Sequence, residues 1–210
     1  MSTLYVGDVH GQFHYLKKAI RFYEPNQVYQ VGDLGVWPGS PAWDSLTGFD
    51  VPVYFCDGNH ENFPAIVAGA WKEKHNLFYL PRFTQLENTL FVGGANSIDK
   101  VMRTPGHDWF PEETIKSVPS VLPEVRFVVS HTCPERVFQA CLASGMSSDR
   151  DPSRKALDAV WDTVKPTRWF FGHFHQTITS VLDGCAFYGL HRLDLPGSHG
   201  FHKPGAILVP

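Results

Sequence analysis

Acidic, imidazole and amide side chains recur directly after short apolar segments of this 210-residue sequence. Groups of this kind, without thiolate, suit divalent Mn, Fe, Co, Ni or Zn. Eight of them are too many for one tetrahedral zinc ion, so the set predicts two ions, with one carboxylate bridging them. The eight residues are Asp8, His10, Asp33, Asn59, His60, His131, His173 and His175.

The spacing of these residues indicates that they converge. Ligands in open α/β sheets collect at the carboxyl ends of the strands, so residues that follow different strands can meet at one rim. Asp8 with His10, and His173 with His175, are two positions apart. Residues i and i+2 of an extended backbone point the same way, so each pair is expected to act as a near-chelating pair.

The apolar segments themselves predict a mixed α/β chain with more strands than helices. That surplus of strands favours two sheets packed face to face with helices outside. Residues 77–80 and 89–92 are expected to be strands joined by a polar turn, and residues 177–182 and 185–190 to form a hairpin. The other expected strands are 4–6, 27–31, 51–56, 125–129 and 168–171; the helices are 13–23, 111–118 and 153–164; the loops are 37–45 and 192–202.

Bulk composition is that of a globular protein, with 43% hydrophobic and 19% charged residues. The length fits a single domain over residues 1–210. A formal net charge of −3 gives no sign of long-range attraction to nucleic acid or to an anionic membrane, although a local basic patch is compatible with it.

Targeting and redox features favour a cytoplasmic protein. The first residues lack a basic region followed by an apolar stretch, and no run of about 18 apolar residues predicts a membrane span. The four cysteines form no Cys-x-x-Cys pair, and a chain of this size does not need disulfides, so we expect reduced thiols.

Five motifs, in this order, resemble those of the calcineurin-like metallophosphoesterases. Each motif alone is weak, but the ordered set extends from residue 7 to residue 175 and is specific. The resemblance implies a four-layer αββα sandwich of two mixed sheets, with a dinuclear metal site at the carboxyl ends of the strands. The motifs are Gly7-Asp8-Val9-His10-Gly11, Gly32-Asp33, Gly58-Asn59-His60-Glu61, Ser130-His131 and Gly172-His173-Phe174-His175.

The same resemblance implies a role for each residue of the set. Asp8, His10 and His175 would hold one metal ion. Asn59, His131 and His173 would hold the other, and Asp33 would bridge both. His60 would protonate the leaving oxygen, with help from an acid such as Glu61 or Asp8, while a hydroxide shared by the ions attacks the phosphorus. Manganese is the expected metal, with Fe, Zn, Ni and Co as alternatives.

One motif departs from the protein serine/threonine phosphatase branch of this family. That branch carries Gly-Asp-x-x-Asp-Arg-Gly, and its Arg helps to grip the phosphate, whereas residues 32–37 lack the Asp-Arg pair. Lys100 and Arg103 are predicted to replace this grip, Arg103 as a bidentate fork, with Asn59 and His60 also contacting substrate. Alternatives for the same role are Arg136, Arg150 and Arg154.

These features together predict a phosphatase that acts on a small or exposed phosphate ester, among which nucleotides are candidates. A phosphodiesterase or nuclease acting on nucleotides or nucleic acid is the alternative, because the same metal site serves diesters. A metal-binding scaffold without catalysis is a remoter alternative, since the whole predicted set is retained. The sequence does not determine the oligomeric state, the native metals or the role of residues 192–202.

Overall fold

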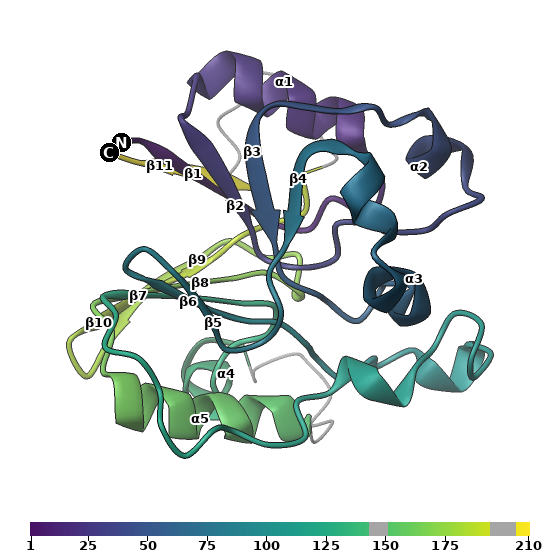
Figure 1. Ribbon diagram of the computed structural model, residues 1–210. Helices are drawn as coiled ribbons and strands as arrows, with labels where there is room; N and C mark the ends of the chain where they lie inside the picture. The colour runs from purple at the N-terminus through teal and green to yellow at the C-terminus, as the bar shows by residue number, and fades with distance from the viewer. Residues whose placement is uncertain (143–150, 194–204) are drawn as a thin grey trace.

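A computed structural model of the protein describes residues 1–142, 151–193 and 205–210. The first of its two sheets has the strand order β11-β1-β2-β3-β4. Strands β1 to β4 run parallel, and β11 pairs with β1 in the antiparallel direction, which brings the two chain ends side by side (Figure 1). The bounds are β1 (Thr3–Val6), β2 (Gln27–Gln30), β3 (Gly48–Phe55), β4 (His75–Tyr79) and β11 (Ala206–Val209).

The second sheet has the order β5-β6-β7-β8-β10-β9. Its central strands β6, β7, β8 and β10 are parallel, and the edge strands β5 and β9 are antiparallel to their neighbours. Strands β9 and β10 form the predicted hairpin. The bounds are β5 (Thr84–Leu86), β6 (Thr89–Val92), β7 (Phe127–Ser130), β8 (Arg168–Phe171), β9 (Ile178–Leu182) and β10 (Cys185–Gly189).

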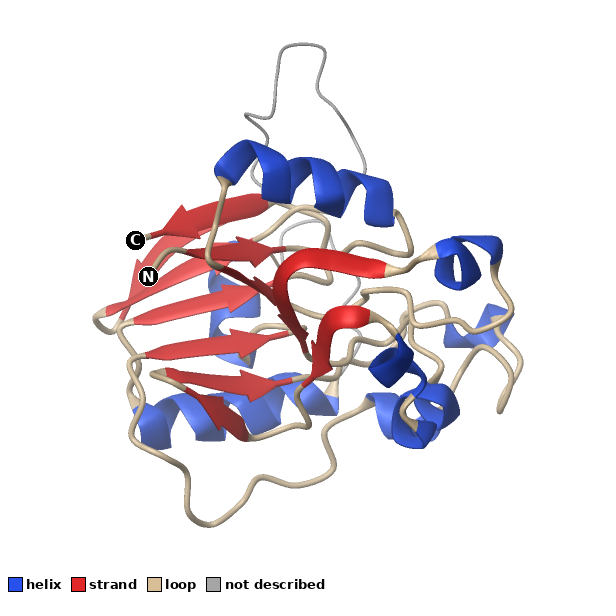
Figure 2. Ribbon diagram, turned by 45° about the horizontal axis from the view of Figure 1, so that its top comes forward, coloured by secondary structure: helices blue, strands red, loops and turns tan. Residues whose placement is uncertain are grey.

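Helices cover the outer faces of both sheets (Figures 1 and 2). On the side of the first sheet lie α1 (Phe13–Tyr23), α2 (Pro41–Ser45) and α3 (Phe63–Ala68). Helices α4 (Glu135–Cys141) and α5 (Pro152–Val164) lie on the side of the second sheet. The protein is therefore a four-layer αββα sandwich of two mixed sheets, as predicted. No helix within the described part of the chain is long and apolar enough to cross a membrane.

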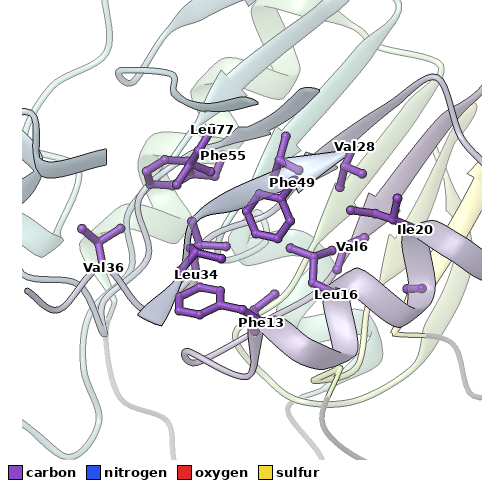
Figure 3. Close-up of a cluster of buried hydrophobic side chains, with 14 of the residues drawn as sticks. Val6, Phe13, Leu16, Ile20, Val28, Leu34, Val36, Phe49, Phe55 and Leu77 are labelled. Carbon is purple, nitrogen blue, oxygen red and sulfur yellow. The ribbon is translucent and has the colours of Figure 1, made fainter. Parts of the chain in front are cut away.

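Three apolar clusters join these layers. The alternation of side chains along β1 feeds two of them, because Leu4 and Val6 face α1 whereas Tyr5 points between the sheets. Figure 3 shows the first cluster, in which Phe13, Leu16 and Ile20 of α1 lie against the first sheet. Each fully buried side chain of this size contributes about 1.5–3 kcal/mol. The third cluster covers the outer face of the second sheet with side chains of α4 and α5.

The core between the two sheets is rich in aromatic rings. Tyr5 of β1 stacks on Phe170 of β8 with ring centroids 3.7 Å apart, so the two sheets contact each other directly. Tyr29 of β2 meets Phe91 of β6 in an edge-on arrangement at 4.9 Å. These contacts fix the two sheets relative to each other, and hence the loops that follow their strands.

The prediction of a helix over residues 111–118 was wrong. Only a 3₁₀ turn, η3 (Pro111–Glu113), forms there. Arg82 accounts for this difference, because its guanidinium takes the backbone carbonyls of Glu112, Glu113 and Thr114, which a helix would need for its own amides.

Two further expectations about the elements need correction. Residues 77–80 and 89–92 do not form one strand pair, because β4 belongs to the first sheet and β6 to the second, where β6 pairs with β5. The expected loop 37–45 contains α2, which starts where the Ser40 hydroxyl accepts from the Trp43 amide and Pro41 occupies the first turn. Most of the expected loop 192–202 lies outside the described residues.

Candidate metal centre

All eight predicted residues follow the carboxyl ends of parallel strands and come together at one rim of the sandwich. The first sheet supplies those after β1, β2 and β3, and the second sheet those after β7 and β8. They are Asp8, His10, Asp33, Asn59, His60, His131, His173 and His175.

One group of potential ligands consists of Asp8, His10 and His175, whose ligand atoms lie within 4.8 Å of one another. The Nε2 of His175 lies 3.0 Å from Oδ2 of Asp8 and 3.1 Å from Nε2 of His10. These are the three residues that the family resemblance assigns to one metal ion. A carboxylate and two imidazoles in such an arrangement match the ligand preferences of Mn, Fe, Co, Ni and Zn.

A second group consists of Asp8, Asp33 and His131, so Asp8 belongs to both groups. The Oδ2 of Asp33 lies between them, 3.4 Å from Nε2 of His131 and 3.7 Å from Nε2 of His10. The Oδ1 of Asn59 is 3.0 Å from Nε2 of His131. Asp33 is therefore placed to serve both groups, and its bridging role stays a prediction.

His173 belongs to neither group. Its ring lies beside that of His131, with centroids 5.1 Å apart, and its backbone N–H donates to both carboxylate oxygens of Asp8. Burial, followed by the neighbouring His131, lowers the pKa of His173 to about 3, which keeps the imidazole neutral. Its role as a ligand stays a prediction.

The backbone at four of these residues is unusual. His10, Asp33, His173 and His175 have φ between 47° and 67°, in the left-handed region that residues other than glycine rarely adopt. The prediction of extended backbone was therefore wrong for the pairs at 8/10 and 173/175, although the side chains of Asp8 and His10 do lie close together. Such conformations persist where the surrounding fold imposes them, and they cluster at functional sites.

Glycines next to the predicted ligands make room for them. A Cβ at Gly58 would overlap the carboxylate of Asp33, and a Cβ at Gly172 would overlap that of Asp8. Neither glycine has a positive φ, so close approach of the side chain, and not backbone freedom, requires glycine at these positions.

The charges in the centre are arranged around two buried carboxylates. Burial by itself would raise the pKa values of Asp8 and Asp33, but the imidazoles around them hold both values below the usual range. Burial also acts to lower the pKa of His131, yet the charge and hydrogen bond of Asp33 raise it to about 9. Two ionised carboxylates in a buried site need positive charge beside them. The donor set therefore fits divalent metal ions.

Arg103 contacts His60, and its role in binding phosphate stays a prediction. Its Nη2 lies 2.8 Å from Nδ1 and 2.5 Å from Nε2 of His60, and its Nη1 donates to the backbone carbonyl of Asn59 at 3.1 Å. An ion pair with Asp99 at 2.7 Å holds the other side of the guanidinium. The Nζ of Lys100 donates to Oδ1 of Asn96 at 3.3 Å, and the side chain is exposed.

The alternative arginines are engaged elsewhere. Arg136 pairs with Asp158 and Asp162 of α5, and Arg154 pairs with Glu135 of α4. Arg150 lies outside the described residues.

The expectation that Glu61 or Asp8 assists His60 is not supported by the contacts. The Glu61 carboxylate accepts from the backbone amides of residues 34–36, at 2.7 Å for Leu34 and 2.8 Å for Val36. Burial and the Asp33 charge raise the pKa of Glu61 to about 8, against these bonds. Asp8 contacts His173, His175 and His10 instead. Glu61 thus fixes the loop that follows Asp33.

Two buried polar networks behind the centre were missed by the sequence reasoning. In one, the Asn59 amide group donates to Ser97, which contacts Glu113. The sequence places Glu113 only within the expected helix 111–118. In the other, Asp57 pairs with Arg82 at 2.6 Å. The only signal for Asp57 was its position directly before Gly58-Asn59.

The chain was compared with known sequences and structures. No curated protein matches the sequence. Among solved structures, the chain is similar to a conserved uncharacterised protein and predicted phosphoesterase from Streptococcus pneumoniae TIGR4, with 10% identity and a TM-score of 0.41 over 100% of this chain and 83% of that one. It is also similar in fold to GAP50, the anchor in the inner membrane complex of Plasmodium, with 12% identity and a TM-score of 0.51 over 99% of this chain and 76% of that one.

The family comparison is more specific. The model of the family described as calcineurin-like phosphoesterase (Metallophos) matches residues 1–177, which include all five motifs. The chain therefore belongs to the calcineurin-like phosphoesterase family, and it is a metal-dependent hydrolase acting on phosphoric ester bonds.

Proposed function

We propose that this hydrolase is a phosphatase that binds two divalent metal ions and acts on a small or exposed phosphomonoester. The observation that carries the proposal is the pair of overlapping donor groups, which share Asp8 and have an oxygen of Asp33 between them. When bound, two such ions activate water as a nucleophile and neutralise charge on the phosphate.

The proposed ligands follow from the predicted assignment. Asp8, His10 and His175 would hold one ion, and their ligand atoms already converge. The other ion would be held by Asn59, His131 and His173, of which Asn59 and His131 are in contact. Manganese is our first choice because the set lacks thiolate and is rich in carboxylate and imidazole, with Fe, Zn, Ni and Co as alternatives.

His60 is the proposed donor of a proton to the leaving oxygen. Its backbone N–H is held by Oδ1 of Asp33 at 2.7 Å, and its ring contacts Arg103. Nη2 of Arg103 lies close to both ring nitrogens, and a guanidinium only donates hydrogen bonds, so the ring has to turn away from Arg103 before a protonated nitrogen can reach the leaving oxygen.

Arg103 is the proposed grip on the transferred phosphate. Its side chain is only 7% exposed, and its Nη atoms already contact Asn59, His60 and Asp99, so binding phosphate would require it to exchange some of these contacts for phosphate oxygens. Lys100 would contribute a more distant point charge from the exposed side of the same segment.

Turnover of chromogenic esters tests the proposal. The protein would be stripped with a chelator, reloaded with Mn, Ni or Zn, and assayed with p-nitrophenyl phosphate and bis-p-nitrophenyl phosphate. Metal-dependent hydrolysis with a faster monoester rate is expected. A faster diester rate would favour the phosphodiesterase or nuclease alternative. Absence of hydrolysis in protein with two bound ions would contradict the proposal and favour the scaffold.

A further inference from the structure

We infer that Glu113 is a positioning residue that fixes the orientation of the Asn59 amide through Ser97, so that the amide oxygen faces the metal centre. This inference rests on the proposed role of Asn59 as a metal ligand. Asn59, Ser97 and Glu113 are all buried and come from three separate segments that follow β3, follow β6 and form η3.

The chain of contacts is continuous. The Nδ2 of Asn59 donates to Oγ of Ser97 at 3.0 Å, and Oγ of Ser97 donates to Oε2 of Glu113 at 2.8 Å. At its other end, Oδ1 of Asn59 lies 3.0 Å from Nε2 of His131. The amide of Asn59 is thus held between the hydroxyl of Ser97 and the predicted ligands.

The chemistry of Glu113 determines which group donates in each hydrogen bond of the series from Asn59 to Glu113. A serine hydroxyl has one hydrogen to donate, whereas an ionised carboxylate only accepts. Glu113 therefore draws the single hydrogen of Ser97 toward itself and leaves Ser97 as an acceptor toward Asn59. Asn59 must then present its NH₂ to Ser97 and its oxygen to the metal centre, where only the oxygen can bind a cation.

The position of Glu113 is fixed by other contacts. Its Oε1 accepts from the backbone N–H of Ser97 at 2.7 Å and from the indole N–H of Trp109 at 3.0 Å, both of which can only donate. Its backbone carbonyl accepts from the amide of Ala95 and from Arg82. Oε1 is thus committed to N–H donors, and Oε2 is left to set the direction of the hydroxyl.

Glu113→Gln tests this direction with almost no change in shape. The two N–H donors require the amide oxygen of Gln at the position of Oε1, so its NH₂ would point at Oγ of Ser97. The Ser97 hydroxyl would then face two NH₂ groups, and its hydrogen would have no acceptor. If the Asn59 amide inverted to accept this hydrogen, its NH₂ would face the metal centre and repel the ion. A change of this kind behind a ligand lowers metal affinity by about 10–100-fold.

Asn59→Asp supplies a matched background in which metal binding no longer depends on the direction in which the Ser97 hydroxyl donates. An aspartate at this position can accept from the Ser97 hydroxyl with one oxygen and bind the ion with the other. Glu113→Gln should therefore lose its effect when it is introduced into Asn59→Asp. A contribution of Glu113 to folding alone would be equally large in both backgrounds.

The experiment is a titration of the metal-free full-length protein with Mn²⁺ by isothermal titration calorimetry. The proteins are the native chain, Asn59→Ala, Asn59→Asp, Glu113→Gln and the double variant Asn59→Asp/Glu113→Gln. We expect Asn59→Ala to lose the second ion and Glu113→Gln to bind it about 10–100-fold more weakly than the native chain. The double variant should bind it at least as tightly as Asn59→Asp.

Two results separate the possible failures. Unchanged binding in Asn59→Ala would overturn the ligand role of Asn59, and with it the positioning role of Glu113. If Asn59→Ala loses the ion but Glu113→Gln binds it normally, the positioning role of Glu113 is overturned and the ligand role of Asn59 stands. The same conclusion follows if Glu113→Gln lowers the affinity equally in the native chain and in Asn59→Asp.

Discussion

Replacing Arg82 with alanine should destabilise the protein strongly, because it leaves a buried carboxylate next to the metal centre without its ion-pair partner. Asp57 is fully buried, and Oδ2 accepts from Nε and Nη2 of Arg82 at 2.9 and 2.6 Å. Its other oxygen, Oδ1, accepts from the Tyr79 hydroxyl at 2.9 Å. The same arginine also holds the three carbonyls of residues 112–114.

The expected loss in the free energy of unfolding follows from the burial of Asp57. Removing one partner of a buried ion pair costs about 3–5 kcal/mol. The Arg82 side chain retains 19% exposure, so we expect the lower end, about 3 kcal/mol. For a chain of this length that corresponds to a melting temperature lower by roughly 6–12 °C.

Urea unfolding of the metal-free protein, followed by circular dichroism, measures this loss. Arg136→Ala is the matched control, because the Arg136 side chain is 43% exposed and pairs with acids on the surface. Such pairs contribute about 0–1 kcal/mol, and the stacking of Arg136 on Trp161 adds about 0.5–1 kcal/mol. A loss in Arg82→Ala no larger than in this control would refute the reasoning.

A second variant tests whether the unpaired charge of Asp57 causes the loss of stability. Adding Asp57→Asn to Arg82→Ala removes the charge while keeping a side chain of the same shape, so part of the stability should return. If the double variant is as unstable as the sum of the single variants predicts, the lost contacts of Arg82 to residues 112–114 explain the effect instead.

Three further predictions concern the site itself. Gly172→Ala should keep the fold but lose bound metal, because the new Cβ overlaps the Asp8 carboxylate; elemental analysis showing normal metal content would disprove this. His60→Gln should retain the metals and lower kcat by about 10²–10⁴-fold, most for esters with poor leaving groups, and an equal loss for good and poor leaving groups would argue against the acid role. Arg103→Lys should raise KM for a phosphomonoester by about 10-fold, since a point charge replaces the fork, whereas Lys100→Ala should change it little; the reverse ranking would assign the grip to Lys100.

The residues of the centre were predictable because each motif is local. A donor that directly follows a parallel strand is carried to the rim of its sheet by the strand, whatever the rest of the chain does. The sandwich followed from the surplus of strands. Even here the local geometry was misjudged, because His10, His173 and His175 reach the centre from left-handed backbone and not from extended backbone.

Long-range polar contacts were not predictable from the sequence. The segment after Pro111 has the composition of a helix start, but Arg82, about 30 positions earlier, captures the carbonyls that a helix needs. The contact of Ser97 with Asn59 joins segments 38 positions apart, and neither residue belongs to a periodic pattern. Such contacts depend on how the two sheets pack.

The most direct test of the dinuclear centre is the number of Mn²⁺ ions that the full-length protein binds before and after Asp33→Asn. The account predicts two ions in the native chain and in the control Asp183→Asn, whose side chain is 77% exposed in the turn between β9 and β10. It predicts one ion or none, with hydrolysis nearly abolished, in Asp33→Asn, because the shared carboxylate is lost. Two tightly bound ions and normal turnover in Asp33→Asn would contradict it.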